Sequence, residues 1–379
     1  MSDPVRVLVI DDSAVMRKLI PQLLQGDPSI QVVGTAMDGI LGQKKIVELK
    51  PDVITLDLEM PRMDGMEALR QIMEHHHLPV IVVSAHNETG AYSALSALAL
   101  GAFDFVAKPR DGDPSTLEQM GRELLLKIKV ASMVGAPKQI LHPPQDAKNG
   151  RGNSSASAQP SRVIALGVST GGPNALEYIF SQLPDNFRGC LVIVQHMPEG
   201  FTEMLANRLN NCSPVKVMEA RSGDAIVRGR AYICPGNHHM RIRRTLNGDI
   251  VILEDRAPVN GHRPSVDVLF NSMAKEYGKK ATAILMTGMG DDGVEGLGSV
   301  LAAGGITMAQ SPDSCVVDSM PRSAIERGYV SSVITLEAIP GILQTLCSNE
   351  ASWSREELVD AVSSGGTDRE SLKLRRRES

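Results

Sequence analysis

The feature that most restricts the fold of this chain is an alternation of short apolar segments with stretches of helical periodicity. The alternation runs from residue 1 to about 127, stops, and resumes from residue 162 to about 349. Strands that alternate with helices form parallel sheets, because each helix returns the chain to the edge where the next strand begins. We therefore expect an α/β protein with two successive parallel sheets. The expected strands are Val5–Ile10, Ile30–Ala36, Val53–Leu56, Val80–Ser84 and Phe103–Ala107, then Val163–Gly167, Cys190–Gln195, Ala231–Cys234, Ala283–Thr287 and Gly305–Ala309.

A polar segment without periodicity separates the two alternating regions. Its most polar part is Gly150–Pro160, which is rich in Ser, Gly and Ala, as flexible linkers are. Near the C-terminus, Ser354 and Glu357 have the spacing of a helix capping box. We expect a first domain at 1–127, a flexible linker at 128–161, a second domain at 162–349 and a tail at 350–379 that is disordered apart from one short helix.

One hairpin is expected within the second region. Asn247 and Gly248 lie between two β-like runs, Met240–Leu246 and Asp249–Leu253. An Asn-Gly pair between apolar runs is the strongest short-range hairpin signal, because both residues tolerate the positive φ angles that the tight turn requires.

The composition of the chain indicates where in the cell the protein is expected. A formal net charge of −5 gives no general attraction to nucleic acid or to anionic lipid. No apolar run reaches the ~18–20 residues that span a bilayer, and the N-terminus lacks a signal-peptide pattern. The five cysteines are scattered, as reduced thiols are in cytoplasmic proteins. We expect a cytoplasmic protein that neither binds nucleic acid nor inserts into a membrane.

Polar side chains follow the ends of four strands in the first region. Asp11 and Asp12 follow the first strand, Asp57 the third, Ser84 ends the fourth and Lys108 follows the fifth. The carboxyl ends of parallel strands meet at one edge, where two carboxylates 4 Å apart repel by ~4 kcal/mol at an effective dielectric near 20. Mg²⁺ accepts sparse carboxylate sets, and an aspartate beside Mg²⁺, a lysine and a hydroxyl can accept a phosphoryl group. Solvated strand-end residues are the alternative, which a set of five matching side chains disfavours.

Residues 1 to about 125 resemble the receiver domain of response regulators. The resemblance implies a flavodoxin-like fold with a five-stranded parallel sheet, Asp57 as the phosphoacceptor and a histidine kinase as the phosphodonor. It also implies a Mg²⁺ ion that assists phosphorylation. The ligands implied for that ion are Asp11, Asp12, Asp57 and the backbone carbonyl of Glu59.

The same resemblance assigns three residues to the phosphoryl group and the switch. Ser84 and Lys108 would contact the phosphoryl oxygens. Phe105 occupies the aromatic switch position, where many receivers have tyrosine. Because phenylalanine has no hydroxyl, its switching would depend on packing alone.

A serine turn opens the second region. The apolar run that begins at Arg162 ends in Gly167–Gly171, which matches the pattern Gly-x-Ser-x-Gly. Ser169 would then lie at the carboxyl edge of the sheet, beside free N–H groups at the start of a helix. Such groups bind an oxyanion or a phosphate, and the turn alone leaves both possibilities open.

Two further strand ends favour a nucleophile. His196 follows the strand at Cys190–Gln195, and Asp291 and Asp292 follow the strand at Ala283–Thr287. A serine, a histidine and an aspartate at three strand ends can form a proton relay. Their order along the chain differs from that of the α/β-hydrolases, so the turn does not indicate that fold. The spacing does not distinguish Asp291 from Asp292.

Residues 162 to about 349 resemble the catalytic domain of the protein-glutamate methylesterases of bacterial chemotaxis. The resemblance implies a doubly wound, mostly parallel α/β domain with Ser169 as nucleophile, His196 as general base and Asp292 as its orienter. Thr170 and the Met289 backbone N–H are implied as oxyanion or substrate contacts. The matching motifs are Ser169–Pro173, Gln195–Pro198, His262–Asp267 and Thr287–Gly293.

The remaining histidines have no clear catalytic partner in the sequence. His262 either lines the substrate cleft or belongs to a structural loop, and the two interpretations are equally favoured. The clusters His75–His77 and His238–His239 lack acidic or cysteine partners nearby in sequence. We interpret both clusters as solvated rather than as metal sites.

Together the two resemblances imply a phosphorylation-activated methylesterase. It would hydrolyse γ-glutamyl methyl esters on the cytoplasmic helices of chemoreceptors, release methanol and deamidate certain glutamines, without a cofactor for the esterase step. We expect the unphosphorylated receiver to cover the Ser169 crevice. Two alternatives stay open: a regulator that binds the same partners without hydrolysis, and a hydrolase that acts on another methylated coiled coil.

Overall fold

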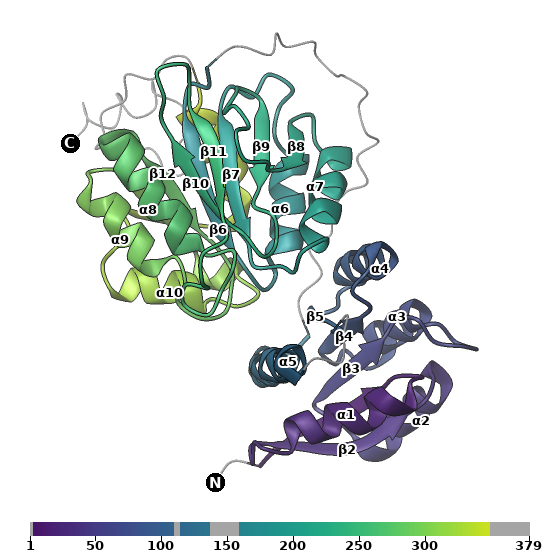
Figure 1. Cartoon of the computed structure of the whole chain (residues 1–379). Helices are drawn as coiled ribbons and strands as arrows, with labels where there is room; N and C mark the ends of the chain where they lie inside the picture. Colours follow the sequence, from purple (N-terminus) through teal and green to yellow (C-terminus); the bar gives the residue numbers. More distant parts are fainter. Residues whose placement is uncertain (1–2, 110–113, 137–158, 349–379) are drawn as a thin grey trace, which may run out of the picture. The chain divides into compact units, whose positions relative to one another are not determined.

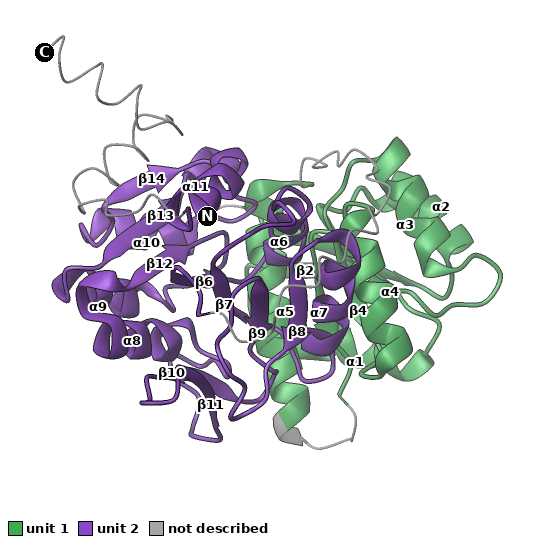
Figure 2. Cartoon of the chain, turned by 90° about the horizontal axis from the view of Figure 1, so that it is seen from above, with its two compact units in different colours: residues 1–141 green, residues 142–379 purple. Residues whose placement is uncertain are grey.

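The computed structural model describes residues 3–109, 114–136 and 159–348. The chain divides into two compact units, residues 1–141 and 142–379 (Figure 2). Each unit has its own sheet and its own buried core, and each is described here by itself.

Unit 1 is a five-stranded parallel sheet with the strand order β2-β1-β3-β4-β5 (Figure 1). This arrangement is the flavodoxin-like fold that the sequence predicts. The order reverses between β1 and β3, and open α/β sheets form their binding crevice at such a reversal. The strands and helices are β1 (Val5–Ile10), α1 (Ala14–Leu24), β2 (Ile30–Ala36), α2 (Gly39–Leu49), β3 (Val53–Asp57), α3 (Gly65–His75), β4 (Val80–Ser84), α4 (Glu88–Ala99), β5 (Asp104–Ala107) and α5 (Pro114–Val134).

Local sequence signals explain where these elements begin. β3 and β4 are buried along their whole length, as central strands covered on both faces are. Four helices start at a residue whose side chain accepts a hydrogen bond from a backbone N–H of the first turn, which fixes the helix start. These N-cap residues are Ser13, Asp38, Asp64 and Asn87.

The last helix of unit 1 extends beyond the expected domain boundary. The sequence places a flexible linker from residue 128, but α5 continues to Val134. Ile128 and Ala131 are fully buried, so this part of the segment is held by packing of one helix face. Residues 137–158 lie outside the described residues.

Unit 2 contains a seven-stranded parallel sheet with the order β14-β13-β12-β6-β7-β9-β8 and an antiparallel hairpin, β10–β11. The mostly parallel second sheet is therefore confirmed. Its strands are β6 (Val163–Val168), β7 (Cys190–Gln195), β8 (Lys216–Glu219), β9 (Arg230–Ile233), β10 (His239–Arg243), β11 (Ile250–Glu254), β12 (Thr282–Leu285), β13 (Ile306–Gln310) and β14 (Ser332–Ile334). Its helices are α6 (Gly172–Ser181), α7 (Phe201–Cys212), α8 (Val266–Tyr277), α9 (Val294–Ala302), α10 (Ser319–Glu326) and α11 (Ile339–Leu346).

The order of this sheet also reverses between β6 and its neighbour β12. From β6 the chain adds β7 and the edge strand β8, with β9 then inserted between them, and from β12 it adds strands toward β14. Helix α6 contacts α7 and α11, and α9 contacts α8 and α10, so the helices form two groups, as expected for a doubly wound sheet. The binding crevice is therefore expected at the carboxyl ends of β6 and β12.

The sequence missed two strands of unit 2, and both lie at the edges of the sheet. β8 and β14 are short, and polar residues interrupt their apolar pattern. The antiparallel pairing of β10 with β11 confirms the hairpin, but not the tight Asn-Gly turn. The last pair is Arg243 with Ile250, so residues 244–249 form a longer loop, in which Gly248 but not Asn247 has a positive φ. The helix expected after Ser354 lies outside the described residues. None of the described helices is both long and apolar enough to cross a bilayer.

Candidate active site and phosphorylation site

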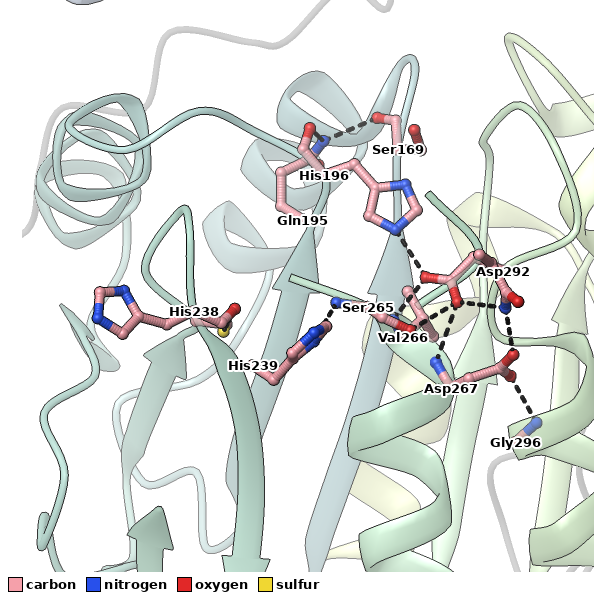
Figure 3. Close-up of polar contacts among 12 residues, drawn as sticks. Ser169, Gln195, His196, His238, His239, Ser265, Val266, Asp267, Asp292 and Gly296 are labelled. Atoms are coloured by element: carbon pink, nitrogen blue, oxygen red, sulfur yellow. Dashed lines mark hydrogen bonds and ion pairs between the residues drawn. The ribbon is translucent and has the colours of Figure 1, made fainter. Parts of the chain in front are cut away.

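Three adjacent strands of unit 2 bring the predicted nucleophile, base and acid to one edge of the sheet. Ser169 follows β6, His196 follows β7, and Asp292 lies in the loop between β12 and α9 (Figure 3). Because β12, β6 and β7 are neighbours, residues far apart in the sequence meet where the strand order reverses.

His196 and Asp292 form a direct pair. His196 Nε2 lies 2.8 Å from Asp292 Oδ2, and both side chains are almost fully buried. His196 Nδ1 is also buried, meets no hydrogen-bond partner among the described residues, and points to the side of Ser169 (Figure 3). The imidazole thus has one nitrogen committed to the carboxylate and the other directed toward the serine. Hydrogen bonds between nucleophile and base are often long without substrate.

Asp292 is held by the first turn of α8. Its carboxylate accepts hydrogen bonds from the Val266 backbone N–H at 2.6 Å and from the Ser265 hydroxyl at 2.7 Å. Burial alone would raise the pKa of Asp292, but the bonds from His196, Ser265 and Val266 outweigh it and lower the pKa to about 2. The N-terminal end of a helix favours negative charge, so Asp292 is stabilised as a carboxylate beside His196.

The structure distinguishes the two adjacent aspartates that the spacing could not. The side chain of Asp291 is 64% exposed and lies 3.9 Å from Arg327, at the surface. Asp292 is 1% exposed and contacts His196. Only Asp292 can orient the imidazole.

Close backbone contacts fix the serine turn. The Ser169 N–H donates to the Thr287 carbonyl at 3.0 Å, which joins the β6 and β12 loops. Gly288 packs so closely that an added Cβ would lie 2.7 Å from the Ser169 Cβ. The Thr287 hydroxyl donates to the Thr170 carbonyl at 2.9 Å. The Met289 N–H donates to no acceptor within the described part of the chain, so it is available for a ligand.

Gln195 is a site residue that the sequence analysis did not single out. It ends β7, is 2% exposed, and its Nε2 donates to the Ser169 carbonyl at 3.0 Å and to the His196 carbonyl at 3.1 Å. It therefore joins the backbones of the serine and histidine turns. Its sequence signals were its position directly before His196 and its place at the start of the matching motif Gln195–Pro198.

Two histidines take positions that the sequence left open or misjudged. The ring of His262 stacks on that of His196, with centroids 3.9 Å apart and planes 4° from parallel. We expected His239 to be solvated, but it is buried and only 1% exposed. Its Nδ1 accepts from the Ser265 N–H at 3.2 Å, so it supports the loop that holds Asp292. Burial occurs because His239 lies in β10, which packs on α8.

The acidic residues of unit 1 also converge. Ligand atoms of Asp11, Asp12 and Asp57 lie within 4.8 Å of one another, the only such group of potential metal ligands in the described residues. Lys108 Nζ lies 2.7 Å from Asp57 Oδ2 and 3.1 Å from Asp11 Oδ2. Asp11 Oδ2 is buried without a hydrogen bond. This donor set fits Mg²⁺, which prefers carboxylate oxygens.

The pKa values at this cluster are shifted by burial and by charge. Burial raises the pKa of Asp11, Lys108 opposes the shift, and the charge of Asp57 adds to it. Burial would lower the pKa of Lys108, but the hydrogen bond to Asp57 and the charge of Asp11 raise it. The Lys108 ammonium group alone therefore does not fully offset the burial and the mutual repulsion of the clustered carboxylates.

The two residues predicted to act in the switch, Ser84 and Phe105, each contact other residues of unit 1. The Ser84 hydroxyl donates to the Gly90 carbonyl at 2.8 Å, at the start of α4. Phe105 is 4% exposed, with Lys127 Nζ 5.4 Å from its ring centroid. The Glu59 N–H donates to Asp57 Oδ1 at 3.3 Å, and the role of the Glu59 carbonyl stays a prediction.

Comparisons with known proteins match both units. The family model for the response regulator receiver domain matches residues 7–120, and that for the CheB methylesterase matches residues 164–343. A protein-glutamate methylesterase/protein-glutamine glutaminase of Koribacter versatilis is 56% identical over 90% of this chain and 95% of its own length. One of Pseudomonas aeruginosa is 41% identical over 93% of this chain and 99% of its own length.

Among solved structures, the CheB methylesterase catalytic domain of Thermotoga maritima is 39% identical. The match covers 49% of this chain and 98% of the Thermotoga maritima domain, with a TM-score of 0.48. The two family models and the two relatives define a response regulator whose output domain is a hydrolase. The chain belongs to the protein-glutamate methylesterase/protein-glutamine glutaminase family.

Proposed function

We propose that this enzyme removes methyl groups from γ-glutamyl methyl esters on chemoreceptor cytoplasmic helices and deamidates certain receptor glutamines. Residues 162–349 would form the catalytic domain, in the cytoplasm, with Ser169, His196 and Asp292 as the triad. The contact of 2.8 Å between His196 Nε2 and Asp292 Oδ2, beside the serine turn, supports this proposal most directly. The names of the relatives, protein-glutamate methylesterase/protein-glutamine glutaminase, support protein glutamate esters and glutamines as substrates.

The geometry supports an acyl-serine mechanism. Ser169 Oγ attacks the ester carbonyl while His196 Nδ1 takes its proton, and Asp292 stabilises the imidazolium that forms. The Met289 N–H and the Thr170 region stabilise the oxyanion. The C–O bond then breaks, and His196 returns the proton to the leaving methoxide, which departs as methanol. Water, activated by His196, hydrolyses the acyl-serine to glutamate. With a glutamine substrate the leaving group is ammonia.

Regulation would act through Asp57 as phosphoacceptor, with a histidine kinase as the phosphodonor. Asp11, Asp12, Asp57 and the Glu59 carbonyl would hold Mg²⁺, which neutralises charge on the phosphoryl group during transfer. Lys108 lies 2.7 Å from Asp57 and is positioned to contact a phosphoryl oxygen. Ser84 would exchange its bond to Gly90 for one to the phosphoryl group.

We expect repression by the unphosphorylated receiver to be incomplete. A phosphoryl group adds about one to three charge-assisted hydrogen bonds, each worth roughly 1.5–3 kcal/mol. Moving a two-state gate from 1:99 to 99:1 requires ~5.5 kcal/mol. Because these magnitudes are similar, the unphosphorylated protein should retain measurable activity.

Methanol release from membranes that carry methylated chemoreceptors tests both parts of the proposal. The wild type should release methanol slowly and respond to a phosphodonor, whereas Asp57→Asn should keep only the basal rate. Ser169→Ala should abolish release, by roughly 10⁴-fold or more, with folding intact. Equal stimulation of wild type and Asp57→Asn would exclude Asp57 as the switch. Release retained by Ser169→Ala would exclude Ser169 as the nucleophile.

A further inference from the structure

We propose that the turn at residues 259–262 is a positioning element that holds the catalytic histidine and aspartate in their reactive arrangement. Asn260 contacts Asp292, and His262 contacts His196. The two contacts come from one tight turn, so both members of the pair are oriented by a single local structure. The inference rests on the triad proposed above and extends it by two residues.

The backbone of the turn is fixed by its own hydrogen bonds. The Val259 N–H donates to the His262 carbonyl at 3.0 Å, and the His262 N–H donates to the Val259 carbonyl at 2.9 Å. Asn260 has φ 52° and Gly261 has φ 77°, the positive angles of a type I′ turn. Asn and Gly tolerate this conformation best. The turn therefore presents the side chains of Asn260, at its centre, and of His262, at its end, with little conformational freedom.

Asn260 bridges two buried carboxylates. Its Nδ2 donates to Asp292 Oδ1 at 3.0 Å and to Asp267 Oδ2 at 2.6 Å. Asp292 is 1% exposed and Asp267 is 5% exposed, so their mutual repulsion is poorly screened by water. A shared N–H donor between them offsets that repulsion and fixes the direction of the Asp292 oxygens.

The hydrogen bond from Asn260 matters more because Asp267 is itself a buried acid next to Asp292. Burial raises the pKa of Asp267, the Gly296 N–H opposes the shift, and the neighbouring Asp292 raises it further. The Gly296 N–H donates to Asp267 Oδ1 at 2.6 Å, which leaves Oδ2 to face Asn260. The amide therefore acts together with Ser265 and the Val266 N–H to restrain the Asp292 carboxylate, and it is the one of these donors that also bonds the Asp267 carboxylate.

His262 acts on the other member of the pair. Its ring lies parallel to that of His196 at 3.9 Å, a stacking distance. Rotation of the His196 ring about its Cβ–Cγ bond would break the stack. The stack therefore holds the plane of the imidazole, and the bond between Nε2 and Asp292 determines which nitrogen faces the carboxylate.

Two substitutions that preserve the turn test the role of Asn260. Asn260→Gly keeps the positive φ but removes the donor, and it should lower kcat by about 10- to 100-fold, equally at all pH values, with KM unchanged. Asn260→Asp also suits the turn. At low pH its neutral carboxyl can donate as the amide does, and at higher pH its charge repels Asp292 and Asp267, the acids that face it beside His196.

The pH dependence separates positioning from mere structural support. The kcat of Asn260→Asp relative to wild type should fall progressively from about pH 5 to pH 8, because two neighbouring carboxylates raise the pKa of a third. A folded Asn260→Gly with wild-type kcat would overturn the role of Asn260. So would a ratio for Asn260→Asp that does not change with pH.

Two substitutions test the stack separately. His262→Phe keeps a flat ring and should retain most of the kcat, whereas His262→Ala should lose about 2- to 10-fold. Equal losses in the two variants would overturn stacking, since they would indicate a polar role of the imidazole. Wild-type kcat in His262→Ala would exclude any positioning role.

Controls distinguish failure of this inference from failure of the proposed function. All assays use the full chain with saturating phosphodonor, and thermal unfolding verifies folding. Asn247→Gly alters the exposed loop between β10 and β11 and should leave kcat unchanged. If Ser169→Ala retains activity, the triad itself fails. If Ser169→Ala is inactive while the Asn260 and His262 variants match wild type, only the positioning turn fails.

Discussion

Two aspartates, one in each unit, occupy equivalent places but ionise in opposite ways. Asp11 follows β1 and Asp292 follows β12, each beside the reversal of its sheet. Both are 1% exposed. The pKa of Asp11 is raised, with burial as the largest cause, whereas hydrogen bonds outweigh burial at Asp292 and lower its pKa to about 2. Burial alone therefore does not determine the charge of a buried acid.

The difference lies in the donors that each carboxylate meets. Asp292 accepts bonds from His196, from Ser265, from Asn260 and from the Val266 N–H at the start of α8. Asp11 accepts the Ser13 N–H, pairs with Lys108 and faces another carboxylate. The chain itself completes the environment of Asp292. The environment of Asp11 is suited to an added cation, as the proposed phosphorylation site requires.

The largest expected effect is on the rate of methanol release when Asp292 or Asp11 is replaced by asparagine, which removes the charge of that side chain. Asp292→Asn should lower kcat for methanol release by about 10⁴-fold, because the imidazolium loses its counter-charge and its orientation. Asp11→Asn should leave the basal rate unchanged and abolish stimulation by a phosphodonor. The assay compares both variants with wild type, with and without phosphodonor.

The two variants should also differ in stability. Asp292→Asn leaves several buried donors facing an amide and should destabilise unit 2 by about 3 kcal/mol. Asp11→Asn removes a like-charge contact and should leave unit 1 as stable as wild type or more so. Thermal unfolding measures both. A loss of basal activity in Asp11→Asn would contradict the separation of the two sites.

Mg²⁺ gives the next largest effect and should act on unit 1 alone. A ligand that binds only the folded state stabilises it by ≈2.7 kcal/mol at a concentration of 100 Kd. We expect Mg²⁺ to raise the unfolding temperature of unit 1, and a chelator to reverse the shift, without altering that of unit 2 or the basal rate. Asp11→Asn should weaken the response. A shift in unit 2, or a basal rate that falls with chelation, would contradict the comparison.

The sequence predicts the reacting groups of both sites better than their surroundings. Ser169, His196, Asp57 and Lys108 lie at or just after strand ends, and the parallel topology alone brings such positions together. The spacing could not choose between Asp291 and Asp292, because that choice depends on which side chain faces α8. Geometry of that kind arises only from tertiary packing.

The supporting residues were harder to find for the same reason. Asn260, Ser265 and Gln195 act through contacts with residues distant in sequence or through backbone atoms. The Asn260-Gly261 pair did carry a turn signal, the same signal that predicts the hairpin at Asn247. His239 was interpreted as solvated because its burial depends on the packing of β10 against α8.

The smallest expected effect is a pH dependence of opposite sign in the two units. The folded-state pKa of Asp292, about 2, lies below the ordinary value of 3.8, so its contribution to stability is present above pH 4 and is lost as the pH falls toward 2. The shift corresponds to about 2 kcal/mol. For Asp11, whose folded-state pKa is raised, ionisation destabilises unit 1, and protonation at falling pH relieves that cost.

Comparison of wild type with Asp292→Asn and with Asp11→Asn separates the titration of these two aspartates from that of the other acids. Between pH 5 and pH 2, the stability of wild-type unit 2 relative to Asp292→Asn should fall by about 2 kcal/mol. The stability of wild-type unit 1 relative to Asp11→Asn should rise over the acid range. Asp27, whose pKa the hydrogen bond from Lys129 also lowers to about 2, is present in every protein compared and cancels. Changes of equal sign in the two units would show that burial, and not the set of donors, controls both aspartates.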